Sequence, residues 1–487
     1  MSTREHFDVV VIGGGSSGGA VASRLSEDES CTVLVLEAGQ DFPHEEEHPT
    51  PFMVLGPTLG RKGAGHGPPL DDVDWVQHTE PVFGRRVRLG RGKLVGGSGM
   101  INGSIGVRGR PEDFAIWEQA GAAGWSWDDV RPFYEAVDEM APLQQWDRSE
   151  WLPGPERMVA GFEELGFRWV DDMNAPDSWD GVVGPWPQNR RNGIRQGSLV
   201  TYVRAARKRS NFTLRARALV DRVLVAGGRA TGVRYIDESG SAVEVGADRV
   251  IVSAGAIGSS PVLLRSGIGP AAQLARLGIE GVADLPVGTG LMDHAYFRTL
   301  FRIPRQTAKL FGPGMAAVVR HADWYAIPAP YDEEEGLCSL AFILATRDGG
   351  GTIRLNSVDP ADNPLVSLTS YLEGVVADNS YDSPWDHYHR LLETGVLRDA
   401  GFAPVNDDRD LEEQLRGGVG SAQHYAGGCR IGEVVDSDLR VYGFENLHVA
   451  DASVFPRHVS NNPDRTCMMI GEFAAARIKN LTKETVS

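Results

Sequence analysis

The chain has 487 residues, well beyond the roughly 250–300 residues at which a single hydrophobic core stops growing, so we expect two domains. Hydrophobic residues make up 41% and charged residues 23% of the sequence, which is ordinary for a folded protein and excludes a disordered chain. The formal net charge of −18 argues against nucleic acid as a partner, because phosphate binding needs clustered Lys and Arg.

The N-terminal segment predicts a βαβ unit. An apolar strand at residues 9–12 leads into a glycine turn and a helix that carries Ala20, Val21 and Leu25, and a second apolar strand follows at residues 33–36. Glycines interrupt the first apolar run long before it could cross a bilayer. We therefore expect neither a membrane span nor secretion.

The turn of this unit carries a dinucleotide-binding pattern. Gly13, Gly15 and Gly18 directly follow the strand, and Glu37 ends the next strand roughly 20 residues further on. The first glycine permits a tight turn, the second lets backbone N–H groups approach a pyrophosphate, and the third lets helix and strand pack closely. Glu37 would accept hydrogen bonds from a ribose. A glycine-rich turn without a ligand is the alternative, which the position of Glu37 disfavours.

The rest of the chain alternates between irregular and periodic segments. Residues 41–69 lack periodicity and predict a long surface loop that could act as a lid over a cofactor. A helical stretch is expected over residues 110–140, with Pro111 in its first turn, and residues 171–195 indicate an irregular connector. The other predictions are a β meander with strands at 212–214, 220–225, 231–236 and 242–252, and a helix at 384–397 with Ser383 as its N-cap.

Two glycine-rich segments, residues 92–102 and residues 255–269, resemble the signature patterns of the glucose-methanol-choline (GMC) oxidoreductase family. The resemblance extends over nearly the whole chain and is closest to choline-dehydrogenase-like and choline-oxidase-like members. It implies an α/β fold: a Rossmann-like FAD-binding domain, with a smaller α+β substrate domain built on an antiparallel sheet. We expect the FAD-binding domain to comprise residues 1–155, 196–300 and 415–487, and the substrate domain to comprise residues 156–195 and 301–414.

The resemblance also implies a set of FAD contacts. Ile101 stands where some members carry the histidine that links FAD covalently, so we expect FAD to bind non-covalently. Val220 is the residue expected against the adenine, although a role in the core explains it almost as well. The full expected set is Gly13, Gly15, Ser16, Ser17, Gly18, Glu37, Ala38, Trp75, Val95, Gly96, Gly97, Asn102, Gly103, Ser104, Ile105, Val220, Ala254, Gly255, Asp451, Ala452, Asn462 and Pro463.

The C-terminal segments at residues 421–432 and 462–472 resemble the family's catalytic region. They imply that His424 is the base and that Asn462 is its catalytic partner. An alcohol releases hydride only as its hydroxyl proton leaves, and a histidine is suited to receive that proton near neutral pH. Asn462 can donate a hydrogen bond to the developing alkoxide without competing for the proton. His458 is the rival histidine, with a substrate contact as its alternative role.

The implied reaction is oxidation of the CH–OH group of a primary or sugar-type alcohol, with hydride transfer to flavin N5. The electron acceptor is expected to be O2 or a quinone or other redox carrier. The alternative is a non-redox or light-driven enzyme of the same fold, such as a hydroxynitrile lyase or a photodecarboxylase. A photodecarboxylase would not need the base, so His424 and Asn462 together favour alcohol oxidation. A flavin-binding protein without catalysis fits the two motifs least well.

Several other residues have more than one interpretation. Gly106 and the pair Asp464-Arg465 depart from the family pattern, and Arg465 would either reshape the pocket or reach solvent. The cluster Arg85, Arg86, Arg88 and Arg91 is interpreted as a solvated face rather than as a phosphate contact. The four cysteines are scattered, which indicates reduced thiols in a cytoplasmic protein, and no residue spacing predicts a metal site.

Overall fold

A parallel β-sheet forms the core of one half of the molecule. The structure, a computed structural model, describes residues 4–44, 73–304, 315–332, 335–345, 349–405 and 411–484. The central strands run in the order β10-β2-β1-β13 and are parallel to one another, with β23 parallel to β13 at the other side. Their bounds are β1 (His6–Ile12), β2 (Val33–Leu36), β10 (Phe212–Arg215), β13 (Ala242–Val252) and β23 (Leu447–Val449).

The antiparallel strands β12 (Arg229–Ile236) and β11 (Leu219–Ala226) extend this sheet from β13. The strands expected at 220–225, 231–236 and 242–252 are therefore present as a meander. The segment expected as the first meander strand forms β10, which instead pairs in parallel with β2. All four residues of β2 are buried, as expected for a parallel strand covered on both faces.

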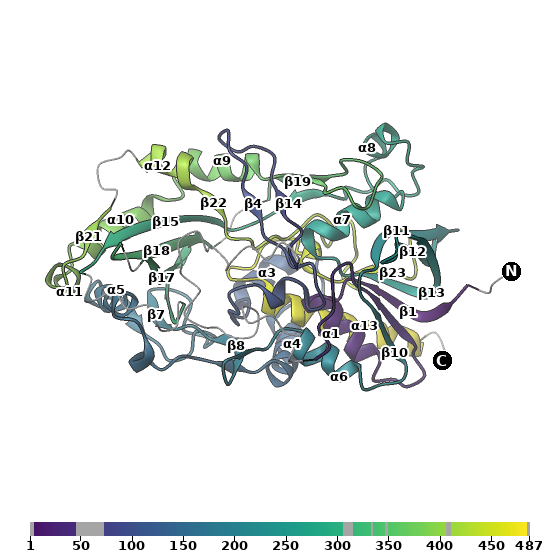
Figure 1. The fold of residues 1–487 in the computed structure, drawn as a ribbon, viewed down its shortest axis with the longest axis horizontal. Coiled ribbons are helices and arrows are strands. Elements are labelled where there is room, and N and C mark those ends of the chain that lie inside the picture. The colour runs from purple at the N-terminus through teal and green to yellow at the C-terminus, as the bar shows by residue number, and fades with distance from the viewer. Residues whose placement is uncertain are drawn as a thin grey trace.

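Helices α1 (Ser16–Leu25) and α13 (Asp464–Glu484) pack against each other beside the parallel sheet (Figure 1). Their approach is close because Gly471 lacks a side chain: a Cβ there would lie 2.5 Å from the carbonyl oxygen of Ser17. The N-terminal turn and the C-terminal segment, far apart in sequence, thereby meet in space.

The helix expected over residues 110–140 is in fact two helices, α3 (Pro111–Gln119) and α4 (Trp127–Met140). Gly121 and Gly124 between them have φ of +101° and +78°, which a helix does not accommodate. Ser126 then caps α4 by accepting a hydrogen bond from the N–H of Asp129. Pro111 lies in the first turn of α3, as predicted.

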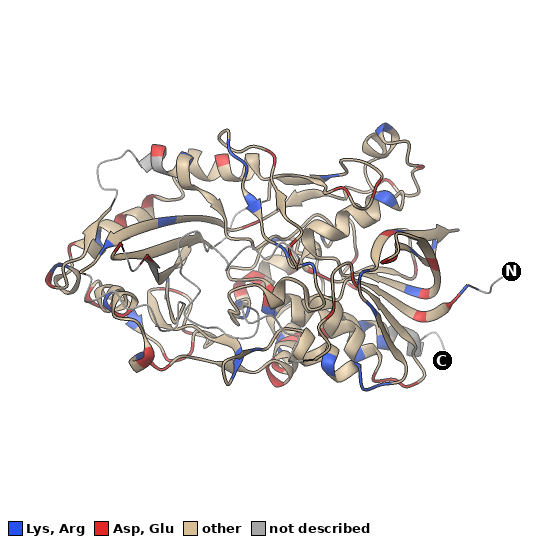
Figure 2. Cartoon of the chain, in the orientation of Figure 1, with Lys and Arg blue, Asp and Glu red and all other residues tan. Residues whose placement is uncertain are grey.

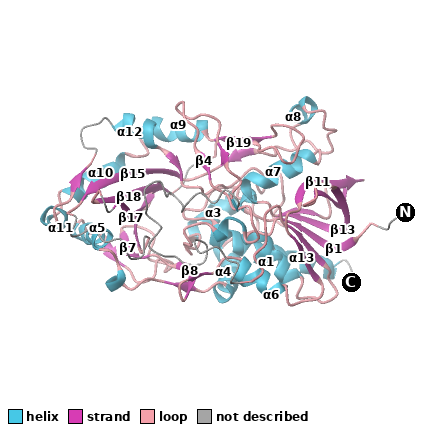
Figure 3. Ribbon diagram, viewed as in Figure 1, coloured by secondary structure: helices cyan, strands magenta, loops and turns pink. Residues whose placement is uncertain are grey.

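The other half is built on a largely antiparallel eight-stranded sheet, which confirms the expected two-part α/β fold (Figure 3). Seven of its strands run in the order β21-β15-β18-β17-β16-β7-β6, and β22 pairs with β15. The bounds are β6 (Arg168–Trp169), β7 (Val182–Pro185), β15 (Ala295–Arg302), β16 (Ala317–Arg320), β17 (Trp324–Asp332), β18 (Leu337–Leu344), β21 (Ala403–Pro404) and β22 (Gly420–Ser421). Residues 295–300 and 420–421, which were expected in the FAD-binding part, belong to β15 and β22 of this sheet.

Residues 171–195 contain strands where an irregular connector was expected. Besides β7, they form the hairpin of β8 (Gln188–Arg191) and β9 (Ile194–Arg195). Asn192 and Gly193 at its tip both have positive φ, the signature of a tight hairpin turn. The predicted helix at 384–397 is also divided: α10 (Asp382–Leu392) begins after Tyr381, so Ser383 lies inside it, and Thr394 caps α11 (Gly395–Asp399).

The remaining elements surround the two sheets. The lid predicted at residues 41–69 lies outside the described residues from residue 45 onward. The helices are α5 (Pro153–Glu164), α6 (Arg204–Ala206), α7 (Gly255–Arg265), α8 (Ala271–Arg276), α9 (Thr369–Ala377) and α12 (Leu411–Gly418). The short strands are β3 (Gln77–His78), β4 (Arg88–Leu89), β5 (Leu143–Gln144), β14 (Thr289–Leu291), β19 (Gly351–Arg354) and β20 (Leu365–Ser367).

Basic and acidic residues are interspersed over both halves of the molecule (Figure 2). Such mixing differs from the basic stripe of a nucleic-acid-binding face. Within the described part of the chain, no helix combines the length and the apolar character needed to cross a bilayer.

Candidate active site

A cavity of about 660 Å³ extends from the N-terminal glycine turn to the C-terminal residues singled out in the sequence. Both halves of the molecule contribute to its walls. It brings together most of the predicted site residues: Gly13, Gly15, Ser16, Ser17, Glu37, Ala38, Trp75, Gly97, Asn102, Gly103, Ile105, Val220, Ala254, Gly255, His424, Asp451, Ala452, Asn462 and Pro463.

Four predicted residues lie behind the cavity wall instead: Gly18, Val95, Gly96 and Ser104 do not line it. A Cβ on Gly18 would lie 1.9 Å from the carbonyl oxygen of Gly13, so this glycine lets helix α1 pack on the turn. Gly96 has φ of +94°, and its N–H donates to the carbonyl of Gly14. These two glycines therefore shape the wall from behind.

At the end of the cavity near α1, backbone segments pack directly against one another. A Cβ on Gly97, whose φ is +57°, would lie 2.9 Å from the Cα of Gly15. A Cβ on Gly13 would lie 2.5 Å from the carbonyl oxygen of Ser253. Three segments distant in sequence therefore converge where only glycine fits, and they leave a cradle with bare backbone on its surface.

Glu37 lies at the carboxyl end of β2 and is held by the backbone. Its Oε2 accepts from the N–H of Gly14 and its Oε1 from the N–H of Gly39, both at 2.8 Å. Burial raises the pKa of Glu37 to about 7, against these hydrogen bonds, which favour the ionised form. Because the side chain also lines the cavity, it can accept a further hydrogen bond from a hydroxyl there.

Asp451, which follows β23, likewise forms hydrogen bonds to backbone N–H groups. Its carboxylate accepts from the N–H of Gly255 and the N–H of Ser453, each at 2.8 Å, and from the hydroxyl of Ser259. Burial raises its pKa. These contacts fix the start of α7 against the turn that carries Ala452.

These features fit a dinucleotide cofactor such as FAD. The glycine cradle gives a pyrophosphate access to backbone N–H groups at the start of α1, and Glu37 lies where a ribose is expected. Val220 and Ala38 line the same cavity, as expected for adenine and ribose contacts. Among the described residues, no group of His, Cys, Asp and Glu could hold a metal ion.

His424 lies in the loop after β22, and polar groups from several segments hold it in position. Its backbone N–H donates to Oδ1 of Asp293 at 2.8 Å. Its Nε2 lies 2.9 Å from Nδ2 of Asn462, and its Nδ1 lies 2.9 Å from Nδ1 of His294. The hydroxyl of Tyr325 is 3.5 Å from the same Nδ1.

These partners determine the tautomer of His424. Nε2 of His294 lies 3.0 Å from the carbonyl of Val459, which can only accept, so His294 carries its proton there. Burial lowers the pKa of His294 well below its ordinary value, so the ring is neutral and Nδ1 is an acceptor. Nδ1 of His424 must then donate, which leaves the lone pair on Nε2. On the other side of the ring, the amide N–H of Asn462 is a donor, so it also requires an unprotonated Nε2 on His424.

Nε2 of His424 lies beside Asn462 on the cavity wall. Of the two groups beside Nδ1, Tyr325 also lines the cavity, whereas His294 does not. The Oδ1 atom of Asn462 is buried and has no hydrogen-bond partner among the described residues. A hydroxyl entering here would take the place of the Asn462 N–H at the Nε2 lone pair, with the amide N–H and the amide oxygen of Asn462 beside it.

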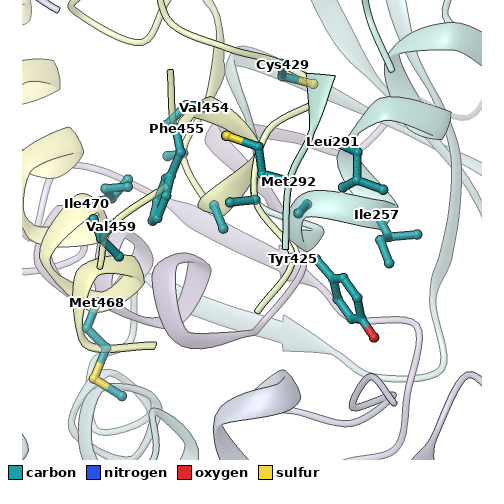
Figure 4. Packing of buried hydrophobic residues seen from close by; sticks show 14 of the residues in the cluster. Ile257, Leu291, Met292, Tyr425, Cys429, Val454, Phe455, Val459, Met468 and Ile470 are labelled. Atoms are coloured by element: carbon teal, nitrogen blue, oxygen red, sulfur yellow. The ribbon is translucent and has the colours of Figure 1, made fainter. Parts of the chain in front are cut away.

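The loop that carries His424 rests on a rigid apolar core. Figure 4 shows Met292, Tyr425, Phe455 and Val459 among the buried side chains of one hydrophobic cluster, to which Met468 and Ile470 of α13 also belong. The partner loops of His424 and His294 therefore share one packed cluster, which holds the spacing between the two rings.

His458, the rival histidine, lies behind the site and does not line the cavity. Its Nε2 contacts the carbonyl oxygen of His424, its Nδ1 lies 2.8 Å from the carbonyl of Val459, and its ring lies 3.9 Å from that of His294. The role in substrate contact considered for His458 has no support in this geometry.

Arg465 neither shapes the pocket nor reaches solvent, contrary to both expectations. It is fully buried, donates to the carbonyl of Ala141 at 2.7 Å and to Oδ1 of Asn189 at 2.6 Å, and pairs with Asp138. Gly106, the other departure, is closely packed: a Cβ there would lie 2.1 Å from Cδ2 of Leu143 and 2.9 Å from Oδ1 of Asn189.

The prediction of a solvated face for the arginine cluster is wrong for Arg91. It lines the cavity, lies over the ring of Trp75 at 5.4 Å, and donates to Gln77 at 2.5 Å. Burial lowers its pKa to about 10. Cys429 is buried, and burial raises its thiol pKa to about 12, consistent with inert packing.

Sequence reasoning missed His294, Asp293 and Tyr325. Asp293 and His294 lie just before β15, and Tyr325 lies on β17, which is separated from β15 by β18 in the same sheet. No local spacing in the sequence connects them with His424. Their relation to it arises only when the eight-stranded sheet forms.

Comparison of the sequence with known proteins identifies the family of this chain. The sequence matches the family model described as GMC oxidoreductase over residues 7–296, and a second model of the same description over residues 347–471. An oxygen-dependent choline dehydrogenase from Brucella anthropi is 30% identical over 552 aligned residues, which cover 98% of this chain and 96% of that protein. A glucose dehydrogenase (FAD, quinone) from Drosophila pseudoobscura pseudoobscura is also 30% identical, covering 97% of this chain and 87% of that one.

Solved structures share the fold. The crystal structure of pyridoxine 4-oxidase from Mesorbium loti matches with a TM-score of 0.86 at 24% identity, covering 97% of this chain and 99% of that chain. A point mutant of formate oxidase from Aspergillus oryzae RIB40 matches with a TM-score of 0.85 at 21% identity, covering 99% of this chain and 100% of that one.

Proposed function

Because the chain belongs to the GMC oxidoreductase family, whose cofactor is FAD, we propose that it oxidises the CH–OH group of a small alcohol with His424 as the base. The observation that carries this proposal is the Nε2 lone pair of His424, held beside the amide of Asn462 on the wall of the cavity. When bound, FAD supplies the hydride acceptor. The glycine cradle, Glu37 and Asp451 would hold it.

The proton has a defined path in this proposal. The substrate hydroxyl replaces the Asn462 N–H as the donor to Nε2 of His424, and the released Nδ2–H of Asn462 donates to the substrate oxygen as negative charge develops on it. Nδ1–H of His424 continues to donate to His294 as the imidazolium forms. His294 is neutral, so it stabilises that cation as an acceptor without competing for the proton.

We propose that FAD is held non-covalently. Ile101 lines the cavity at the position expected for a flavin-linking residue, and its hydrocarbon side chain cannot form such a bond. Precipitation of the protein with acid should release the yellow chromophore into the supernatant. A chromophore that stays with the denatured chain would contradict this part of the proposal.

We propose O2 or a quinone as the physiological electron acceptor, since the similar choline dehydrogenase is described as oxygen-dependent and the similar glucose dehydrogenase as a quinone enzyme. Turnover followed with O2 and with a quinone dye distinguishes the two.

Anaerobic mixing of the holoenzyme with a panel of alcohols tests the proposed reaction. An alcohol that is a substrate should bleach the oxidised flavin absorbance in one phase and yield one equivalent of the aldehyde or ketone. A spectrum unchanged by every alcohol, including primary, sugar and aryl types, would contradict it.

A further inference from the structure

The eight-stranded sheet presents one face to the substrate end of the cavity. Residues alternate along β15, β17 and β18, and those that line the cavity fall into three rows across the strands. The first row is Tyr296, Ile343 and Tyr325; the second is Arg298, Ala341 and Ile327; the third includes Ser339 and Ala329.

The first row lies beside the catalytic pair. Its Tyr325 hydroxyl is 3.5 Å from His424, and Tyr296 follows His294 by two residues. Arg298 lies one row further along β15, about 7 Å from the first row, because each strand residue advances the chain by roughly 3.3 Å. A substrate whose hydroxyl contacts His424 would extend along these rows toward Arg298.

The surroundings of Arg298 are mostly apolar and small. Ala341 lies directly opposite it on β18, and Ile327 continues the row on β17. Together with Ala329, these side chains leave room for a flat or chain-like body between Arg298 and the first row. The guanidinium lies over the ring of Tyr296, 5.6 Å from its centroid.

The acidic residues that line the cavity belong to other elements. Among the described residues that line the cavity, none of the acidic ones lies on β15, β17 or β18; they are Glu37, Asp74, Asp362, Asp451 and Asp464. Arg298 is thus the charged residue that the sheet face presents to this end of the cavity.

We infer that the substrate is an alcohol that carries an anionic group, a carboxylate or a phosphate, at the end remote from the oxidised carbon, and that Arg298 binds this group. The inference rests on the proposed oxidation by His424. A guanidinium offers paired N–H donors that match a carboxylate or phosphate, and the partly desolvated cavity strengthens the contact.

The same geometry disfavours a quaternary ammonium substrate, which the similarity to choline dehydrogenases would otherwise suggest. A trimethylammonium group needs aromatic faces, and the face of Tyr296 is already covered by the Arg298 guanidinium. Two cations would then share one ring. The net charge of −18 attracts cations from a distance, but salt screens that field over roughly 8 Å, so the local guanidinium decides binding in the cavity.

The experiment uses the holoenzyme and four para-substituted benzyl alcohols that differ only in the remote group: carboxylate, phosphate, methyl and aminomethyl. Anaerobic flavin reduction is measured as a function of concentration for each. The carboxylate or phosphate alcohol should reach half-saturation at a concentration ~10- to 100-fold lower than the methyl alcohol. The aminomethyl alcohol should be the weakest. Comparison of the two anionic probes identifies which anion the site prefers.

Two variants connect this preference with Arg298. Arg298→Met should abolish the preference for the anionic alcohols, and Arg298→Lys should restore part of it, because an ammonium keeps the charge but not the paired donors. Arg302→Met is the matched control. Arg302 lies further along β15 at the exposed end of the strand and does not line the cavity, so the preference should persist.

Calorimetric binding of 4-methylbenzoate, which has no hydroxyl to oxidise, gives a readout independent of turnover. It should bind the wild type and Arg302→Met but not Arg298→Met, whereas 4-methylbenzamide should bind all three weakly. Equal reduction by all four alcohols, unchanged in Arg298→Met, would overturn the inference and leave the proposed oxidation intact. Binding of the benzoate through Arg298, without flavin reduction by any alcohol, would overturn the proposed oxidation and leave the anion site intact.

Discussion

Nδ1 of His424 lies 2.9 Å from Nδ1 of His294, and only one of these two nitrogens can carry the proton between them. The carbonyl of Val459 on the far side of His294 assigns that proton to His424. A buried backbone carbonyl thus determines, through two rings, that the nitrogen of His424 beside Asn462 is a base.

Replacing His294 should lower catalysis without loss of cofactor. His294→Ala removes the acceptor that fixes the tautomer of His424, so flavin reduction should slow by ~10- to 100-fold with little change in half-saturation. His294→Gln should recover much of the rate, because its amide oxygen can accept from His424 while its NH₂ donates to Val459. Stopped-flow absorbance measures both. His78→Ala, an exposed histidine on β3, is the control; equal rates in all variants would refute this role.

The affinity for FAD should increase with pH up to about 7. Glu37 has its pKa raised to about 7 by burial, so it is largely protonated below that pH in the FAD-free chain. Ribose hydroxyls donate to the ionised carboxylate, and binding therefore releases a proton. Affinity should then rise as pH increases from about 5 toward 7 and level off above it.

Titration of the FAD-free protein with FAD, followed by quenching of flavin fluorescence between pH 5.5 and 8.5, measures this dependence. Glu37→Gln should bind more weakly at pH 8 and lose most of the slope. A wild-type affinity that stays flat across this range would show that Glu37 does not ionise on binding.

Gly97→Ala should weaken FAD binding by more than the cost of placing an alanine at positive φ. The new Cβ would lie 2.9 Å from the Cα of Gly15, so the two loops must separate and the cradle must widen. Gly84→Ala is the control: Gly84 also has positive φ, at +77°, but nothing lies within 4 Å of the position that a Cβ would occupy there. We expect at least ~10-fold weaker FAD binding for Gly97→Ala, since roughly 1.4 kcal/mol corresponds to tenfold. Similar affinities for both variants would argue against the close approach.

Arg465→Met should destabilise the fold rather than alter the chemistry. It removes one of the two arginine partners of Asp138, which keeps Arg108, and it takes the donor from two buried acceptors, Ala141 O and Asn189 Oδ1, each of which costs about 1–3 kcal/mol when left unpaired. Arg131→Met, which breaks an exposed pair with Glu135 on the same helix α4, should cost less than about 1 kcal/mol. Urea midpoints compare the two. Equal midpoints would mean that the contacts of Arg465 contribute no more to stability than the exposed pair does.

The sequence was most informative where local pattern determines structure. The βαβ unit with Gly13, Gly15 and Glu37 is recognisable because each residue acts within one turn or at the end of the next strand. His424 and Asn462 were identified through motifs, and the structure places both on one cavity wall.

Other parts of the site depend on contacts that no local pattern encodes. His294 meets His424 across 130 residues, and Arg298 shares a row with Ala341 only because β15 pairs with β18 in one register. The burial of Arg465 likewise depends on Asp138 and Asn189, which come from distant segments. Such relations arise from strand register and helix packing, which the hydrophobic pattern of one chain leaves open.

The rate of anaerobic flavin reduction in His424→Ala tests the central role of the Nε2 lone pair most directly. The variant should retain FAD and its urea midpoint, yet reduce its flavin at least ~100-fold more slowly at pH 7 with the best alcohol found. Its rate should recover with added imidazole, which can occupy the vacated space and accept the proton. Reduction near the wild-type rate, in protein that holds a full complement of FAD, would contradict the assignment of His424 as the base.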